Sequence, residues 1–94
     1  MKEKRFSSVW DAIEASPSEA ASMKARSELM MAIRKIVDGW TLTQMQASKR
    51  LGITQPRLND LLRGRINKFS LDALIDIAAR SGLSVKMKIV RSAA

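Results

Sequence analysis

The chain has 94 residues, enough for one small domain, and its apolar fraction of 46% is ordinary for a folded protein. It contains neither Cys nor His, which excludes disulfides, thiolate or imidazole metal sites, and catalysis by a Cys nucleophile or a His base. We therefore expect a protein that is not an enzyme and that binds no metal and no cofactor.

The formal net charge is +8, and the positive charge is concentrated in the middle third of the chain. Residues 1–42 carry seven Lys or Arg and six acidic residues, whereas residues 43–68 carry six Lys or Arg and Asp60 alone. Residues 69–94 carry four basic and two acidic residues. Such a basic segment attracts polyanions, above all nucleic acid. From charge alone, a solvated face that only aids solubility is an equal alternative.

The N-terminal residues predict no targeting signal. Lys2, Lys4 and Arg5 are basic, but no apolar run follows them, so we expect no signal peptide. No stretch of the sequence approaches the roughly 20 apolar residues of a membrane span. We expect a cytoplasmic protein with no membrane partner.

The first half of the chain predicts one short and one long helix. Residues 8–11 read as a capping box with Asp in the place of Glu, so a short helix is expected over about 9–15. Ser16 is a stronger start, because Pro17 follows it at the first helical position. Apolar residues then repeat at helical spacing until Gly39, which predicts a helix over about 17–38.

Three shorter helices are predicted next, each with a hydroxyl or amide residue at its start and a glycine after its end. The first covers about residues 44–51, with Thr43 at its start and Gly52 after its end. The second covers about 54–63, from Thr54 or Gln55 to Gly64, and the third about 71–81, from Ser70 to Gly82.

The last segment changes to the alternating pattern of a β-strand over about 83–90. Its apolar positions are Leu83, Val85, Met87 and Ile89. No second strand is predicted, and a lone strand leaves its backbone groups unpaired. We expect antiparallel pairing with the same strand of a second copy, in a homodimer. Pairing with another protein, pairing with residues near Phe6 and a frayed tail are the alternatives.

Residues 42–64 carry the most specific pattern in the chain, two short helices joined by a tight turn. Counted from Gln44, a small residue stands fifth and a glycine ninth, at Ser48 and Gly52. Apolar residues occupy the fourth, eighth, tenth, fifteenth and eighteenth positions: Ala47, Leu51, Ile53, Leu58 and Leu61. This spacing predicts a helix-turn-helix over about 43–63.

The run Leu42 to Gly64 resembles the helix-turn-helix of the phage-repressor-like, or XRE, family, with Ser48 in the place of the more usual Ala. Over about residues 6–90 the chain is also similar to HigA-like antitoxins. The segments that carry this similarity are 6–13, 27–30, 54–57 and 69–74. The resemblance implies one all-α, five-helix repressor-like domain over residues 1–94, with a C-terminal strand that pairs across a dimer.

The resemblance also implies a function, namely a sequence-specific transcriptional repressor that regulates its own gene. As an antitoxin, it would neutralise a RelE/HigB-like ribonuclease toxin, whose strand is then a candidate partner for the tail. Two alternatives stay open: a solitary phage-type repressor without a toxin, and a protein-interaction module that has lost DNA binding. The dimer would hold two recognition helices about 34 Å apart on a palindromic operator of double-stranded DNA.

Residue roles on DNA follow from this family pattern. The helix that begins near Thr54 would enter the major groove, where the Gln55 amide can pair with adenine N6 and N7. The expected base-reading residues are Gln55, Arg57 and Asn59. The expected phosphate contacts are Thr43, Gln44, Thr54, Arg63, Arg65 and Lys68. Asp60 is expected to orient Arg57 or Arg63, while Trp10 and Trp40 are expected in the core.

Overall fold

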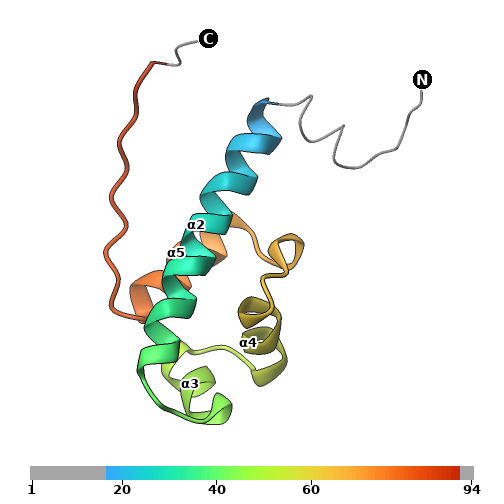
Figure 1. Cartoon of the computed structure of the whole chain (residues 1–94), viewed down its shortest axis with the longest axis vertical. Coiled ribbons are helices and arrows are strands. Elements are labelled where there is room, and N and C mark those ends of the chain that lie inside the picture. Colours follow the sequence, from blue (N-terminus) through green and yellow to red (C-terminus); the bar gives the residue numbers. More distant parts are fainter. Residues whose placement is uncertain (1–16, 92–94) are drawn as a thin grey trace, which may run out of the picture.

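The computed structural model describes residues 17–91, and this part of the chain is all-helical, as predicted (Figure 1). It contains four α-helices and one 3-10 turn: α2 (Pro17–Gly39), α3 (Gln44–Leu51), α4 (Gln55–Leu62), η1 (Ile66–Lys68) and α5 (Leu71–Arg80). The helix expected over 9–15 lies outside the described residues, together with Trp10 and Ser16. Five helices were expected for the chain, and the structure has four α-helices within residues 17–91.

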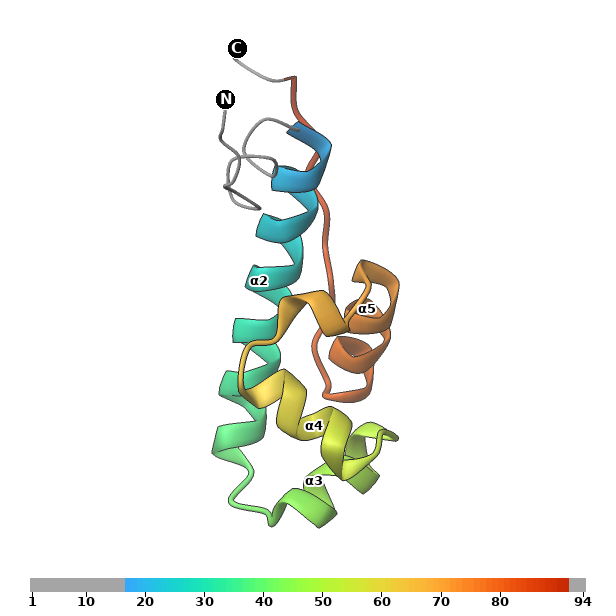
Figure 2. The ribbon, with the colours of Figure 1, turned by 90° about the vertical axis from the view of Figure 1, so that its right-hand side faces the viewer.

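The long helix α2 packs against α4, η1 and α5, while α3 packs against α4 and α5 (Figure 2). Met30, Ile33 and Val37, spaced by three and four residues, bury one face of it, while the opposite face is exposed. The helix ends at Gly39, but the left-handed conformation expected of a glycine stop is taken by Thr41, with φ of 55°. None of the helices within residues 17–91 is long and apolar enough to cross a membrane.

The three shorter helices begin at the predicted caps. The Thr43 hydroxyl accepts the N–H of Gln46 at 3.1 Å, and the Ser70 hydroxyl accepts the N–H of Ala73 at 3.1 Å. Each cap satisfies a backbone donor that has no partner inside its own helix. The sequence does not predict the 3-10 turn η1, because no cap marks its start.

The core lies where α2, α3, α4 and α5 meet. Its largest fully buried side chains come from all four helices: Ile33, Leu51, Leu58, Leu61 and Leu74. Phe69 is buried beside them, and Trp40 packs against the core half-buried, as expected. Because α4 buries Leu58 and Leu61 on one side, its opposite side and its N-terminus face outward.

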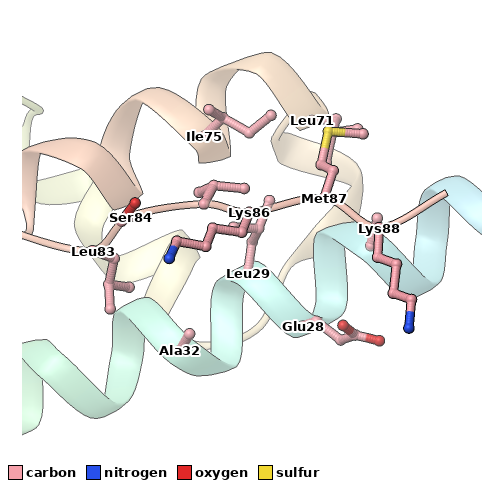
Figure 3. Close-up of a pocket in the computed structure, with 12 residues that line it drawn as sticks. Glu28, Leu29, Ala32, Leu71, Ile75, Leu83, Ser84, Lys86, Met87 and Lys88 are labelled. Atoms are coloured by element: carbon pink, nitrogen blue, oxygen red, sulfur yellow. The ribbon is translucent and has the colours of Figure 1, made fainter.

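The C-terminal segment is extended and lies beside α2 and α5 (Figure 3). Its last backbone hydrogen bond within the described residues runs from the N–H of Leu83 to the carbonyl of Ala78, at 3.0 Å. The strand predicted over 83–90 is therefore not formed in the single chain. A strand exists only through hydrogen bonds to a neighbouring strand, and the described part of the chain offers none.

Candidate nucleic-acid interface

The turn between α3 and α4 is closed by backbone hydrogen bonds. The N–H groups of Gly52 and Ile53 donate to the carbonyls of Lys49 and Ser48 at 3.1 and 3.0 Å. Gly52 has φ of 71°, a conformation that glycine adopts without strain. The buried Ser48 hydroxyl donates to the Met45 carbonyl at 2.8 Å. The two helices are thus fixed relative to one another, as the predicted helix-turn-helix requires.

The N-terminus of α4 is exposed and polar. Thr54 is its N-cap, and the Thr54 hydroxyl accepts the N–H of Arg57 at 3.2 Å. Gln55 and Pro56 follow, both exposed. Within residues 17–91 the Gln55 amide makes no hydrogen bond, so its donor and acceptor are both available to a ligand.

The start of α3 presents a second exposed polar site. Thr43 and Gln46 form a capping box, in which the Gln46 side-chain oxygen accepts the N–H of Thr43 at 3.0 Å. Gln44 is exposed, and its side chain has no partner in the described part of the chain. A side-chain amide at a helix N-terminus can hold a phosphate, because the adjoining backbone N–H groups favour negative charge.

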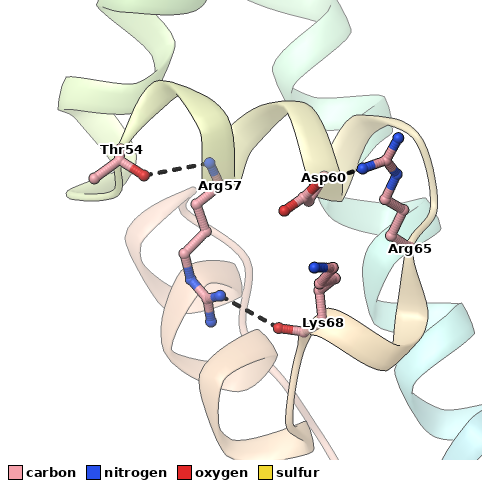
Figure 4. A network of polar contacts seen from close by, with 5 residues as sticks. All are labelled: Thr54, Arg57, Asp60, Arg65 and Lys68. Carbon is pink, nitrogen blue, oxygen red and sulfur yellow. Dashed lines mark hydrogen bonds and ion pairs between the residues drawn. The ribbon is translucent and has the colours of Figure 1, made fainter.

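Arg57 is half-buried, and its guanidinium lies against the segment that follows α4 (Figure 4). Its guanidinium lies 4.4 Å from the centre of the Phe69 ring and donates to the Lys68 carbonyl at 3.3 Å. This bond occupies Nη1 alone, so the expectation that Arg57 reads a base stays a prediction. Asn59, the other expected base reader, is half-buried.

Asp60 pairs with Arg65 rather than with Arg57 or Arg63, so that expectation was wrong. The Asp60 carboxylate and the Arg65 guanidinium are 3.0 Å apart, and the N–H of Arg65 donates to the Asp60 carbonyl at 3.0 Å (Figure 4). The chain reverses at Gly64, with φ of 72°, which returns Arg65 to the last turn of α4. Arg63 and Lys68 are exposed, and their side chains have no partner within residues 17–91.

Arg26 is the residue of this region that sequence reasoning missed. It lies on α2, and its guanidinium donates to the carbonyls of Ile66 and Phe69 at 3.2 and 3.3 Å. A signal for it exists in the sequence, because position 26 precedes Met30 by four residues and Ile33 by seven. That spacing places Arg26 on the buried face of α2, where a charged side chain needs a polar partner.

The exposed polar residues of α3, α4 and the following segment form one basic region, and its acidic residue, Asp60, is paired with Arg65. Within residues 17–91 no group of three or more acidic side chains gathers closely enough to hold a metal ion. The arrangement suits contacts to phosphates and base edges.

Comparison with known proteins agrees with this geometry. Residues 12–90 match the family described as "Helix-turn-helix domain". A solved structure described as "Putative XRE Family Transcriptional Regulator" is similar to this chain, with a TM-score of 0.72 and 25% sequence identity. The similarity covers 80% of this chain and 84% of that chain. No curated protein matches the sequence. Because the family match spans most of its length, the chain belongs to the helix-turn-helix domain family.

Proposed function

We propose that this protein is a sequence-specific DNA-binding transcriptional repressor that inserts the N-terminus of α4 into the major groove. The observation that carries the proposal is the position of the Gln55 amide. It is exposed at the first residue of α4 and makes no hydrogen bond within residues 17–91. The similar solved structure is described as a transcriptional regulator, which supports a regulatory role for this chain.

In this proposal Gln55 reads an adenine through its amide, and a set of exposed residues around it holds the DNA backbone. Asn59 is a second base contact, at the half-buried edge of α4. The residues proposed for the phosphates are Thr43, Gln44, Thr54, Arg63, Arg65 and Lys68. Arg65 can keep its ion pair with Asp60 while it presents its remaining donors, since a guanidinium has five N–H groups.

We propose further that the protein acts as a homodimer on a palindromic operator. Residues 84–91 are extended, and none of their backbone groups is hydrogen-bonded within the described part of the chain. Met87 and Ile89 are 75% and 87% exposed, which is unusual for large apolar side chains in one short segment. Antiparallel pairing with the same segment of a second copy would satisfy the backbone and cover these side chains.

An antitoxin role, with a RelE/HigB-like toxin as the protein partner, is the finer part of the proposal and is supported by the resemblance over residues 6–90. If a neighbouring gene encodes a small basic protein, we expect co-expression with that protein to give a stable complex and to relieve the growth arrest that it causes. Repression without any such complex would instead identify a solitary phage-type repressor.

The test is a gel shift with DNA from upstream of the protein's own gene and with random-sequence DNA, over a salt series. The wild type is compared with Gln55→Ala and with Gln44→Ala, two exposed glutamines that each begin a helix. We expect Gln55→Ala to lose about 1–3 kcal/mol of discrimination between the two DNAs. Gln44→Ala should weaken binding to both DNAs equally, because a phosphate contact carries no sequence information.

Failure of the wild type to bind either DNA at low salt would refute the DNA-binding proposal. The protein would then be an interaction module that keeps the fold only. Binding that weakens steeply with salt, with discrimination lost in Gln55→Ala alone, would support both the function and the orientation of α4.

A further inference from the structure

The segment after α4, residues 63–69, carries three of the proposed phosphate contacts and is here called the basic loop. Its cations are Arg63, Arg65 and Lys68, and η1 is its only regular structure. Arg63 and Lys68 are exposed, so they do not fix the shape of the loop. A backbone that is already ordered in the free protein spares the entropy cost of ordering it when these side chains bind phosphates.

Arg26 holds this loop from the side of α2. Its Nη1 donates to the Ile66 carbonyl at 3.2 Å and to the Phe69 carbonyl at 3.3 Å, while its Nε donates to the Ser22 carbonyl at 3.3 Å. The bonds to Ile66 and Phe69 join residues 40 and 43 positions apart in the sequence. One half-buried guanidinium therefore ties both ends of η1 to the long helix.

Arg57 holds the same loop from the side of α4. Its guanidinium bonds the Lys68 carbonyl at 3.3 Å and stacks 4.4 Å from the centre of the Phe69 ring. The Phe69 ring is buried in the core, so the stack joins the loop to the rigid part of the domain. Between them, Arg26 and Arg57 bind the carbonyls of Ile66, Lys68 and Phe69.

We propose that Arg26 is a positioning residue for DNA binding, with Arg57 as its counterpart on α4. Arg26 orders the basic loop in the free protein, so that Arg63, Arg65 and Lys68 meet the phosphates without first losing backbone entropy. Each arginine bonds the loop through its Nη1, so each acts directly on the shape of the loop. The inference rests on the proposed function, since it concerns the affinity for the DNA backbone.

Three variants on α2 test the role of Arg26. Arg26→Met removes the donors and the charge but keeps much of the side-chain length, while Arg26→Lys keeps the charge and part of the donor set. Lys24→Met removes one charge from the exposed side of the same helix, at a residue with no partner within residues 17–91. It is the control for the simple removal of a positive charge.

The first readout needs no DNA, namely amide hydrogen exchange in the free protein. In the wild type the N–H groups of Lys68 and Phe69 donate to Arg65 and Ile66 at 3.0 and 3.1 Å. We expect both amides to exchange at least about tenfold faster in Arg26→Met, because the loop opens locally, while the amides of α5 keep their rates. A direct contact between Arg26 and DNA would leave these rates unchanged and would overturn the proposal.

The second readout is affinity for operator and random DNA over a salt series. We expect Arg26→Met to weaken binding to both DNAs by a similar factor, and the salt slope to become shallower by about 1 for every phosphate that the loop no longer reaches. Arg26→Lys should recover part of the affinity, and Lys24→Met should stay near the wild type. If Arg26→Met does not fold, Arg26→Gln replaces it, because the shorter neutral side chain cannot bond both the Ile66 and Phe69 carbonyls. Wild-type-like affinity, salt slope and exchange rates in Arg26→Gln would overturn the proposal.

Different results would refute the proposed function and the proposed role of Arg26. Wild-type protein that binds no DNA refutes the proposed function. Wild-type protein that binds normally, with Arg26→Met equal to Lys24→Met in affinity and slope, refutes the role of Arg26 alone.

Discussion

The guanidinium of Arg80, on α5, lies against the Cα of Gly52 in the turn between α3 and α4. Arg80 Nη1 donates to the Leu51 carbonyl at 3.4 Å, and its Nε pairs with the Asp76 carboxylate at 3.3 Å. A Cβ at position 52 would overlap this guanidinium. The last helix, α5, therefore supports the turn that joins α3 to α4.

Gly52→Ala should lower the free energy of unfolding more than Gly64→Ala does. Both glycines are left-handed, with φ of 71° and 72°, so each substitution costs about 1–2 kcal/mol in the backbone. Only Gly52→Ala also displaces Arg80, because nothing lies within 4 Å of the Cβ at position 64. Urea unfolding of both variants measures the difference, which should vanish in an Arg80→Ala background. A difference that persists there would contradict the prediction.

Thr54→Ala and Ser70→Ala should each destabilise the protein by about 1 kcal/mol, because each removes a helix N-cap. Their effects on DNA binding should differ. Thr54 begins α4, and its hydroxyl proton is available to a phosphate, whereas Ser70 begins α5, outside the proposed interface. Thermal unfolding and gel shifts, with Thr54→Ser as the conservative control, check this. Equal losses of DNA affinity in Thr54→Ala and Ser70→Ala would argue against a phosphate contact.

Ser48→Ala should change stability by no more than about 0.5 kcal/mol, because the only partner of the hydroxyl within residues 17–91 is a carbonyl three residues earlier in the same helix. Ser48→Val should cost about 1–3 kcal/mol, because the site is only 4% exposed and the branched side chain cannot fit without movement of its neighbours. Chemical denaturation of the two variants compares them. A large loss of stability in Ser48→Ala would show that the hydroxyl itself is needed.

Met87→Lys should weaken self-association by at least about tenfold, since each protomer then loses roughly 1.5–3 kcal/mol of apolar burial. Met31→Lys is the matched control, because Met31 is also a largely exposed methionine, at 65%, but lies on α2. Sedimentation over a concentration series distinguishes them. Equal dissociation constants for Met87→Lys and the wild type would remove the tail from the dimer interface.

Much of the fold can be predicted from local signals. The sequence predicts the helix 44–51 with the bounds that the structure has, because Thr43 and Gly52 mark both of its ends. The features that it does not predict depend on how the chain folds back on itself or on a second chain. An arginine on α4 can point into solvent or stack on an aromatic ring. Arg57 stacks on Phe69 only because the η1 turn brings Phe69 back next to α4, and the sequence does not predict that turn. Asp60 pairs with Arg65 because the chain reverses direction at Gly64. The C-terminal segment forms a β-strand only if a second strand pairs with it.

The Gln55 side chain is exposed and makes no hydrogen bond to the rest of residues 17–91. A side chain that supports nothing in its own fold can be exchanged without loss of folding free energy. If Gln55 reads a base as proposed, a single codon change could redirect the protein to a different binding sequence while the scaffold stays intact. Divergence of a repressor from its duplicate, so that the two no longer compete for one promoter, would then require very few mutational steps.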